Sequence, residues 1–325
     1  MKLKHYYFPV GVMVGIFCFF SIIAITNAGN NNNVQPTVGV IGISEESDAI
    51  AVRVLPNPNH YSAVRWYQSQ NFSGSPQSLL VDGYDAVRDG RTVYVNAANI
   101  DEVNKKIYTN IYLISYNQDS NVKTVDVLGQ IIKHWRFNNN LSSIGHCQIS
   151  TLVCRSAADC SQGYACSGNS DAPGRCQPTA AITCATDADC ASGLYCDSLR
   201  AKVARDVRRL GMLGDLRESL SSFKKKNNKY PMLGAGTYLA LSSISTWPSW
   251  QALFLPQLGS SQSLVDPINS LGSCAGYDTT TCWNAETKTF ADPNPNNNIL
   301  ELPGGSYAFV FSGDKNGSNY SLCAA

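Results

Sequence analysis

The sequence predicts an α+β protein of several domains, and three observations lead to this fold class. An uninterrupted apolar run lies near the N-terminus, short β-branched runs alternate with turn signals before residue 117, and eight cysteines precede a long helical pattern. A length of 325 residues fits two or three domains. We expect, in order, a transmembrane helix, an antiparallel β-sandwich, a small disulfide-rich module, and a long helix packed on a small antiparallel sheet.

The composition excludes several classes of protein. The chain has 25 Lys and Arg against 24 Asp and Glu, and this near-zero net charge argues against nucleic-acid binding, which needs a basic surface. Only 15% of the residues are charged, where soluble domains carry about 25%, which indicates a surface or secreted protein. With 4 His in the chain there is little room for a His-based metal centre, and we expect no cofactor.

Residues 1–28 are predicted to form a membrane anchor. The run from Tyr6 to Ile25 is apolar throughout, and about 20 apolar residues cross a hydrocarbon core of about 30 Å. Lys2 and Lys4 precede it, which places the N-terminus in the cytoplasm and the bulk of this single-pass cell-membrane protein outside. The alternative is a cleaved signal peptide, because small residues stand at Thr26–Ala28. Residues 29–35 are an Asn-rich linker.

Residues 36–137 are predicted to form a β domain. Short alternating or β-branched runs are separated by turn signals such as Asp82-Gly83 and Asp89-Gly90, which favours a sandwich of the immunoglobulin or fibronectin type. The predicted strands are 49–55, 63–68, 78–81, 85–87, 92–95 and 107–116. From residue 124 the apolar residues change to helical spacing, which predicts one amphipathic helix that ends the domain at residue 137.

Four aromatic residues of this domain are candidates for carbohydrate binding, because aromatic rings stack on sugar faces. They are Tyr61, Trp66, Tyr67 and Tyr84. The alternative is that these rings only fill the surfaces of a sheet.

Residues 147–196 carry a duplicated cysteine pattern. Two triplets with five residues between successive cysteines repeat at an offset of 30 residues, each with Asp before the middle Cys and Gly three residues after it. The disulfide candidates here are Cys147, Cys154, Cys160, Cys166, Cys176, Cys184, Cys190 and Cys196. Four bridges of open connectivity are expected; zinc is disfavoured because its ligands are usually spaced more closely. The pattern resembles small disulfide-rich modules of extracellular proteins.

Residues 198–325 begin with a helical pattern of about 28 residues and continue with strand and turn signals. The segments 204–210 and 228–231, an Asp-Pro turn at 264–267, and the strand signals 306–311 and 320–323 resemble the globular head of type IV pilins and type II secretion pseudopilins. The resemblance implies a long helix packed on a small antiparallel sheet. The run from Tyr6 to Ile25 contains no Glu, so we expect no prepilin leader.

Three more cysteines and one turn complete the set of candidate residues. Cys274 is predicted to pair either with Cys282, which would leave Cys323 free, or with Cys323; a bridge to a partner chain is a further alternative. Oxygen-bearing side chains alternate at Asp314, Asn316 and Ser318, as calcium ligands would, although Asn316-Gly317 is also typical of a type I′ turn.

No catalytic motif stands out in the sequence, and we do not expect an enzyme. The predicted function is that of a membrane-anchored, outward-facing bacterial envelope protein with a structural, adhesive or assembly role. The alternative is a minor component of a type IV pilus or type II secretion apparatus, and a third hypothesis is a cell-wall or polysaccharide hydrolase. The expected partners are the membrane, through residues 6–25, pilin-like or other envelope proteins, and carbohydrate; nucleic acid is not expected.

Overall fold

The structure describes residues 38–42, 48–101, 106–118, 120–148, 153–160, 162–170, 174–234, 238–260, 263–296 and 300–325 of a computed structural model. Within these ranges no helix combines the length and the apolar character needed to cross a membrane. The predicted fold class, which included a transmembrane helix, was therefore wrong for the described residues. The predicted anchor (residues 1–28) and linker (residues 29–35) lie outside the described residues.

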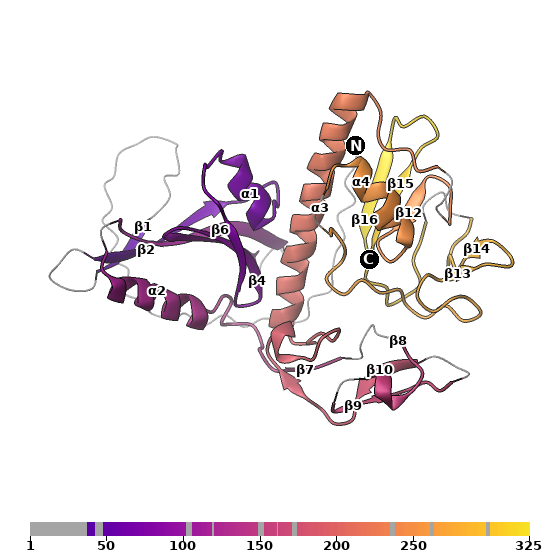
Figure 1. Ribbon diagram of the computed structural model, residues 1–325, viewed down its shortest axis with the longest axis horizontal. Coiled ribbons are helices and arrows are strands. Elements are labelled where there is room, and N and C mark those ends of the chain that lie inside the picture. Colours follow the sequence, from indigo (N-terminus) through magenta and orange to yellow (C-terminus); the bar gives the residue numbers. More distant parts are fainter. Residues whose placement is uncertain are drawn as a thin grey trace.

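Helix α3 (Leu199–Asn227) is the element around which the other described parts are arranged (Figure 1). The side chain of Ser198 accepts a hydrogen bond from the Ala201 backbone N–H and so caps the first turn. Asn228, at φ 58°, ends the helix in the left-handed conformation. Three lysines, 224–226, occupy the last turn, where positive charge interacts favourably with the helix dipole. The predicted long helix is confirmed.

The N-terminal part is a single six-stranded antiparallel sheet in the order β1-β2-β6-β5-β4-β3. Its strands are β1 (Val38–Gly42), β2 (Ala49–Pro56), β3 (Gln77–Val81), β4 (Tyr84–Asp89), β5 (Thr92–Asp101) and β6 (Lys106–Tyr116). The predicted β-sandwich was therefore wrong. Most of the predicted strands are present, but they form one sheet rather than two.

Helices take the place of a second sheet. On one face of the sheet, Leu128 of α2 (Val122–His134) and Val203 and Val207 of α3 join the buried core. On the other face, Trp66 and Tyr67 of α1 (Ala63–Ser69) are buried. Because both faces are covered in this way, a sheet with alternating apolar residues needs no partner sheet.

The segment 63–68 was predicted as a strand and is helix α1. Ser62 is its N-cap, since the Ser62 hydroxyl accepts a hydrogen bond of 3.2 Å from the Arg65 backbone N–H. The buried residues Ala63, Trp66 and Tyr67 follow a spacing of three and four, which is the helical period. The apparent alternation from Val64 to Tyr67 is too short to distinguish a strand from a helix.

The disulfide-rich part contains short strands and two 3₁₀ turns. The elements are β7 (Gly145–His146), β8 (Val153–Cys154), η1 (Ala157–Asp159), β9 (Tyr164–Cys166), β10 (Gly174–Pro178), β11 (Thr183–Cys184) and η2 (Asp187–Asp189). They form a three-stranded sheet in the order β8-β10-β9 and a two-stranded sheet of β11 and β7.

The C-terminal part holds a three-stranded sheet, in the order β12-β15-β16, and a small hairpin. Its elements are β12 (Ser242–Ile244), a π-helical turn η3 (Trp250–Phe254), α4 (Leu255–Gln257), β13 (Trp283–Asn284), β14 (Thr289–Phe290), β15 (Phe309–Gly313) and β16 (Tyr320–Ala324). Leu216 and Leu220 of α3 pack with Trp250, Phe254 and Phe311 in its core. The predicted terminal hairpin is confirmed as β15 and β16.

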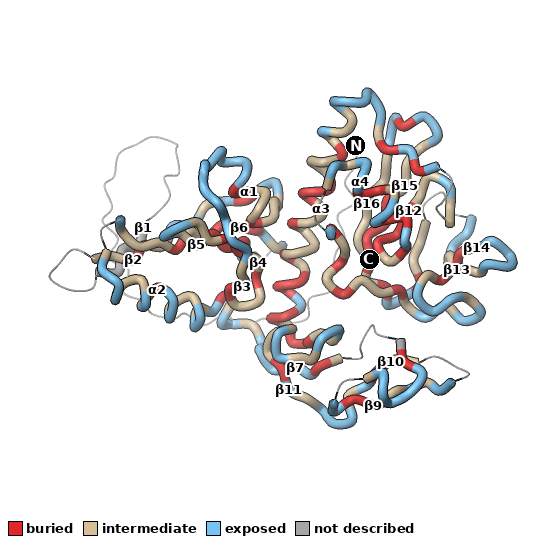
Figure 2. Tube along the Cα trace, in the orientation of Figure 1, coloured by how far each residue is buried: buried red, intermediate tan, exposed pale blue. Residues whose placement is uncertain are grey.

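The long helix is shared between parts of the chain rather than belonging to the C-terminal part alone. Between Leu199 and Lys224 only Lys202 and Ser222 are exposed, and the other residues are buried or half-buried (Figure 2). The predicted arrangement, in which this helix packs only on a small C-terminal sheet, therefore needs correction. The N-terminal sheet covers a second side of the same helix.

Candidate functional site

The four aromatic residues predicted as a carbohydrate platform do not form one. Trp66, Tyr67 and Tyr84 are at most 7% exposed, and Tyr61 is half-buried. The rings of Trp66 and Tyr67 pack against Tyr94. The pKa of the Tyr84 phenol is raised, because burial disfavours its charged form. These side chains are core residues, since α1 and β4 turn them toward the protein interior.

The candidate calcium loop is a hydrogen-bonded turn. The Asp314 carboxylate accepts hydrogen bonds from the backbone N–H groups of Ser318 and Asn319, at 2.7 and 3.1 Å, and from the Ser318 hydroxyl. These hydrogen bonds lower the pKa of Asp314, the bond from the Ser318 side chain most of all. Gly317 alone in this turn has positive φ, at 64°, so the predicted type I′ turn at Asn316-Gly317 is not formed. The carboxylate serves the turn itself.

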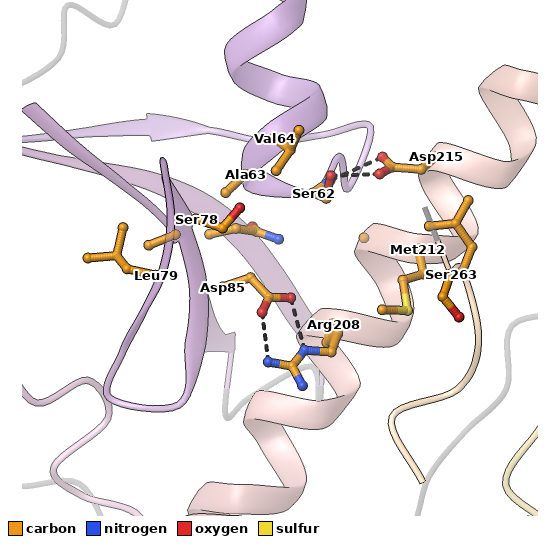
Figure 3. A pocket seen from close by; sticks show the side chains of 14 residues that line it. Ser62, Ala63, Val64, Ser78, Leu79, Asp85, Arg208, Met212, Asp215 and Ser263 are labelled. Carbon is orange, nitrogen blue, oxygen red and sulfur yellow. Dashed lines mark hydrogen bonds and ion pairs between the residues drawn. The ribbon is translucent and has the colours of Figure 1, made fainter. Parts of the chain in front are cut away.

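Ion pairs join α3 to its neighbours. Arg208 binds both carboxylate oxygens of Asp85 on β4, at 2.9 and 2.7 Å (Figure 3). Arg209, one residue along the helix, binds both oxygens of Asp266 in the C-terminal part, at 2.6 and 3.2 Å. Nearer the start of the helix, Arg200 pairs with the buried Asp82. Paired arginines thus reach from one helix to both of the larger parts of the chain.

The middle of α3 also meets the loop that leads into α1. Asp215 accepts hydrogen bonds from the Ser62 hydroxyl at 2.6 Å and from the Ser62 backbone N–H at 3.2 Å (Figure 3). Gly214 permits this approach, because a Cβ there would lie 2.8 Å from the His60 carbonyl oxygen. Burial raises the pKa of Asp215, although the hydrogen bonds from Ser62 oppose that rise.

A cavity of about 140 Å³ lies at this junction. Its polar lining includes Ser62, Asp85, Arg208 and Asp215, which are the residues that join α3 to the N-terminal part. The Ser62 hydroxyl donates to Asp215 and accepts from the Arg65 N–H. Both of these bonds hold structure together, so Ser62 is a helix cap rather than a nucleophile.

Five disulfides pair ten of the predicted cysteines. They are Cys147–Cys190, Cys154–Cys166, Cys160–Cys176, Cys184–Cys196 and Cys274–Cys282. Cys323 is a free, half-buried thiol, which decides between the two alternatives for Cys274. Two groups of three cysteines bring their sulfurs within 4.8 Å of one another, as metal ligands would. Their sulfurs are oxidised in the bridges, so they offer no thiolates to zinc.

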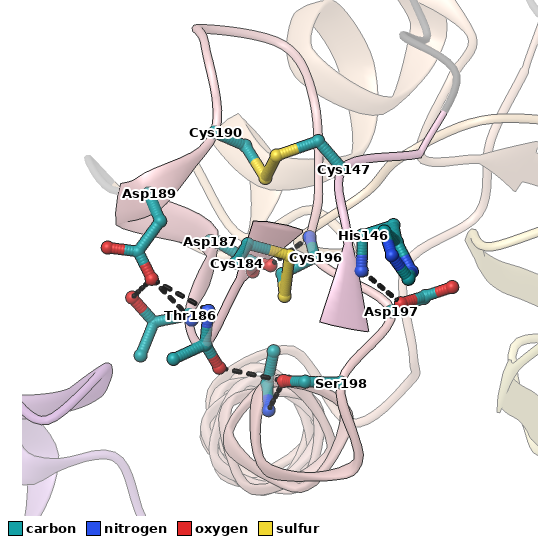
Figure 4. The surroundings of a disulfide bond; sticks show 12 residues. His146, Cys147, Cys184, Thr186, Asp187, Asp189, Cys190, Cys196, Asp197 and Ser198 are labelled. Carbon is teal, nitrogen blue, oxygen red and sulfur yellow. Dashed lines mark hydrogen bonds between the residues drawn. A yellow bond between two sulfur atoms is a disulfide. The ribbon is translucent and has the colours of Figure 1, made fainter. Parts of the chain in front are cut away.

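The duplicated pattern corresponds to two repeats that exchange their leading cysteines. We call residues 147–166 the first repeat and residues 176–196 the second repeat. Within each repeat, a bridge joins the outer cysteines of the triplet, which are 12 residues apart: Cys154–Cys166 in the first repeat and Cys184–Cys196 in the second. The middle cysteine of each repeat is bonded to the leading cysteine of the other. These bridges are Cys160–Cys176 and Cys147–Cys190, and Figure 4 shows the second of them. The two repeats are therefore linked to each other twice.

The Asp that both repeats share stabilises a 3₁₀ turn in each of them. The Asp159 carboxylate accepts from the backbone N–H groups of Arg155 and Ser156, at 2.8 and 2.9 Å. In the same way, Asp189 accepts from Ala185 and Thr186, at 2.9 and 2.8 Å (Figure 4). Gly163 and Gly193, at φ 86° and 81°, provide the left-handed turn that follows.

An open groove of about 630 Å³ lies in the C-terminal part, and its residues were not predicted from the sequence. Its lining consists of Tyr238, Asp278, Thr281, Trp283, Ala285 and Lys288. The rings of Tyr238 and Trp283 are stacked, with centroids 5.0 Å apart and planes at 26°. The Cys274–Cys282 disulfide closes the loop that carries Asp278 and Thr281. No periodic pattern marks this groove, because its aromatic residues stand 45 positions apart in the chain.

No family model, no curated protein and no solved structure matches this chain. The resemblance of residues 200–325 to pilin heads stays a prediction.

Proposed function

We propose that the described part of the chain is an exported structural protein that holds binding surfaces in a fixed arrangement outside the cytoplasm. The protein acts in adhesion or in the assembly of other envelope components, and its partners are envelope proteins or surface carbohydrate. The five disulfides support the exported location, because disulfides persist in oxidising compartments.

One observation carries the proposal: a single helix is joined to every other described part by polar bonds or an apolar core. Arg205 binds Asp187 of the disulfide-rich part, Arg208 binds Asp85 of the N-terminal sheet, and Arg209 binds Asp266 of the C-terminal part. The side chains of Arg205 and Asp266 are 5% and 0% exposed. The Arg208–Asp85 pair is partly exposed, but the sheet is also joined to the helix by Arg200 and Asp82, whose side chains are 9% and 2% exposed. Charges buried in this way need their partners, so the parts cannot separate without a large free-energy cost. Such a joint suits a rigid spacer or scaffold.

The alternative role, packing into a pilus or a type II secretion filament, receives less support. It requires α3 to offer a face to neighbouring pilins. Most of the helix is already covered by the N-terminal sheet and the C-terminal core. The hydrolase hypothesis is also weaker, because the carboxylates Asp85, Asp215 and Asp266 around α3 are each bound to an arginine or a helix cap.

The proposal is tested on cells that produce the intact chain. Trypsin applied outside, after any outer barrier has been opened, is expected to cut near the exposed lysines at the end of α3 and release fragments that react with antibody to the C-terminal part. Full protection would contradict the exported location. Isolated filaments should lack stoichiometric amounts of the chain; their presence would favour the filament role instead.

A further inference from the structure

The groove between Tyr238 and the loop 278–288 is built on a braced frame. The Asp278 backbone N–H donates to the Trp283 carbonyl at 3.1 Å, and the Cys282 N–H donates to the Asp278 carbonyl at 2.8 Å. The Trp247 indole N–H donates to the Thr281 carbonyl at 2.9 Å. With the Cys274–Cys282 bridge, these bonds hold the walls in place before any ligand arrives, which reduces the entropy cost of binding.

The two aromatic rings offer an apolar surface that the core does not fully use. Tyr238 and Trp283 are half-buried, while Trp247, against which the Tyr238 ring packs edge-on, is 1% exposed. Trp247 thus fixes the Tyr238 ring from the inside and leaves the exposed parts of Tyr238 and Trp283 to the groove. Ligand sites combine aromatic or apolar surface with a few polar groups, and the lining of this groove contains both.

Two charged side chains of the groove, Asp278 and Lys288, have atoms that can bind a ligand. One oxygen of Asp278, Oδ1, accepts from the backbone N–H groups of Thr280 and Thr281 and from the Thr281 hydroxyl. Oδ2 has no hydrogen-bond donor among the described residues. Lys288 is exposed, and within the described ranges it makes no ion pair with Asp278 or any other acid. Partial burial opposes ionisation of Asp278, but the hydrogen bonds from Thr281 and Thr280 outweigh it and lower the pKa of this carboxyl.

These features favour a neutral, hydroxyl-rich ligand. An ion of either sign meets one like and one opposite charge at Asp278 and Lys288, so neither sign gains from the pair, and a purely apolar ligand would strip water from both charges. A neutral sugar ring has a flat C–H face for an aromatic surface and a rim of hydroxyls that both donate and accept hydrogen bonds. A carboxylate oxygen, an ammonium and a threonine hydroxyl match that rim.

We propose that this groove binds a neutral saccharide, with the sugar face against the exposed part of the stacked Trp283–Tyr238 pair and hydroxyls bound to Asp278 and Lys288. The site deepens the proposed adhesive role and rests on it for its biological setting. It differs from the platform predicted from the sequence, because it lies in the C-terminal part and its rings are partly exposed.

The test uses the full-length, oxidised chain and a panel of neutral oligosaccharides: cellohexaose, maltohexaose and chitohexaose. Isothermal titration calorimetry should detect binding of at least one of them. Lys288→Met and Asp278→Asn should each weaken that binding about tenfold, because each removes a charged hydrogen bond. Asn at position 278 can still accept the turn bonds from residues 280 and 281, so the loop should keep its fold. Trp283→Ala should abolish binding, and Trp283→Phe should restore part of it.

Matched controls are Lys315→Met and Tyr108→Ala, which change an exposed lysine and a 46% exposed tyrosine away from the groove lining. Both should leave binding unchanged. Absence of binding by all three sugars overturns the inference, as does binding that survives Lys288→Met, Asp278→Asn and Trp283→Phe at full strength. Neither result touches the proposed function, which is tested by protease accessibility of cells and by filament composition.

Discussion

The two repeats of the disulfide-rich part share a pattern but have different surroundings. Both have the same bridge between outer cysteines, the same Asp-stabilised turn and the same left-handed Gly. The second repeat leads directly into α3 and binds it, whereas strands β8 and β9 of the first repeat lie away from the helix (Figure 1). The duplicated residues therefore build the repeat, and residues outside the pattern decide what it contacts.

Two positions account for much of this difference. Asp187 of the second repeat binds Arg205 and also accepts from the Cys196 backbone N–H at 2.9 Å. The equivalent residue of the first repeat, 30 positions earlier, is Ala157, which has no charge to offer. The residue two positions beyond the last cysteine is Ser198 in the second repeat, where it caps α3, and Gly168 in the first.

The exchange of leading cysteines makes the repeats dependent on each other. Strand β7, before Cys147, pairs with β11 of the second repeat, and β10, which contains Cys176, pairs with β8 and β9 of the first. Neither repeat has a complete set of strands and bridges alone. Although only one repeat is docked on the helix, the whole disulfide-rich part is held there.

The largest expected effect is that of reduction. A segment of about 50 residues with so few apolar side chains cannot offset its chain entropy without bridges, which stabilise by about 2–4 kcal/mol each. In the oxidised full-length chain, reductant should make residues 147–196 sensitive to protease. The N-terminal sheet contains no cysteine among its described residues, and its fragment should stay resistant. Mass mapping of the fragments reads both outcomes, and equal loss of both parts would show that they unfold together.

Removing one cross-link at a time should separate the two repeats. The Cys147–Cys190 bridge closes 43 residues and Cys160–Cys176 closes 16. In the chain-entropy description these loops correspond to about 4 and about 3 kcal/mol. The double variant Cys147→Ser/Cys190→Ser should therefore lower the midpoint of denaturant unfolding of the module more than Cys160→Ser/Cys176→Ser does. The reverse order would mean that the docked repeat is held mainly by its contacts with α3.

The docking contact can be tested with two reciprocal substitutions. Asp187→Ala leaves the buried Arg205 guanidinium with one hydrogen bond to the described residues, to the Cys196 carbonyl at 3.0 Å, and should cost about 2–3 kcal/mol. Ala157→Asp places the same acid in the first repeat, far from a buried arginine, and should change stability by less than about 0.5 kcal/mol. Thermal unfolding of both variants measures the difference. Equal effects would contradict the role assigned to Arg205.

The local patterns of the sequence were sufficient for much of the fold. Cysteine spacing predicted the disulfide-rich part, and the long helical period predicted α3. What could not be predicted was which surfaces meet. The pattern around α3 is apolar toward two different neighbours, and Arg208 and Arg209 bind opposite parts of the chain although they are adjacent. From the sequence alone, arginines at these positions would be assigned to the solvent-exposed face of the helix.

The candidate site was missed for a similar reason. Trp66 and Tyr67 were chosen as candidates because they are close together in the chain, yet both lie on the buried face of α1. Tyr238 and Trp283 are far apart in the sequence and meet only through the fold of the C-terminal part. Aromatic content alone does not distinguish a ring in the core from one that lines a groove, since burial depends on tertiary contacts.

The smallest expected effect is a dependence of the two repeats on pH. Hydrogen bonds from the backbone lower the pKa of Asp159, the bond from Arg155 most of all, and the pKa of Asp189 is lowered chiefly by the bond from Thr186. A carboxyl with a depressed folded-state pKa contributes stability that is complete above its unfolded value of 3.8 and is lost as the pH falls through the folded value. The pKa of Asp215 is shifted the opposite way, so protonation of Asp215 does not weaken the junction with α3.

Carboxyl-carbon NMR titration should give pKa values below 3.8 for Asp159 and Asp189 and above 3.8 for Asp215. Asp159→Asn and Asp189→Asn should each reduce the fall in unfolding temperature between about pH 5 and pH 2, by similar small amounts because both turns face solvent. A larger effect at Asp189 alone would indicate that docking on α3, rather than the repeat itself, makes the turn sensitive to pH.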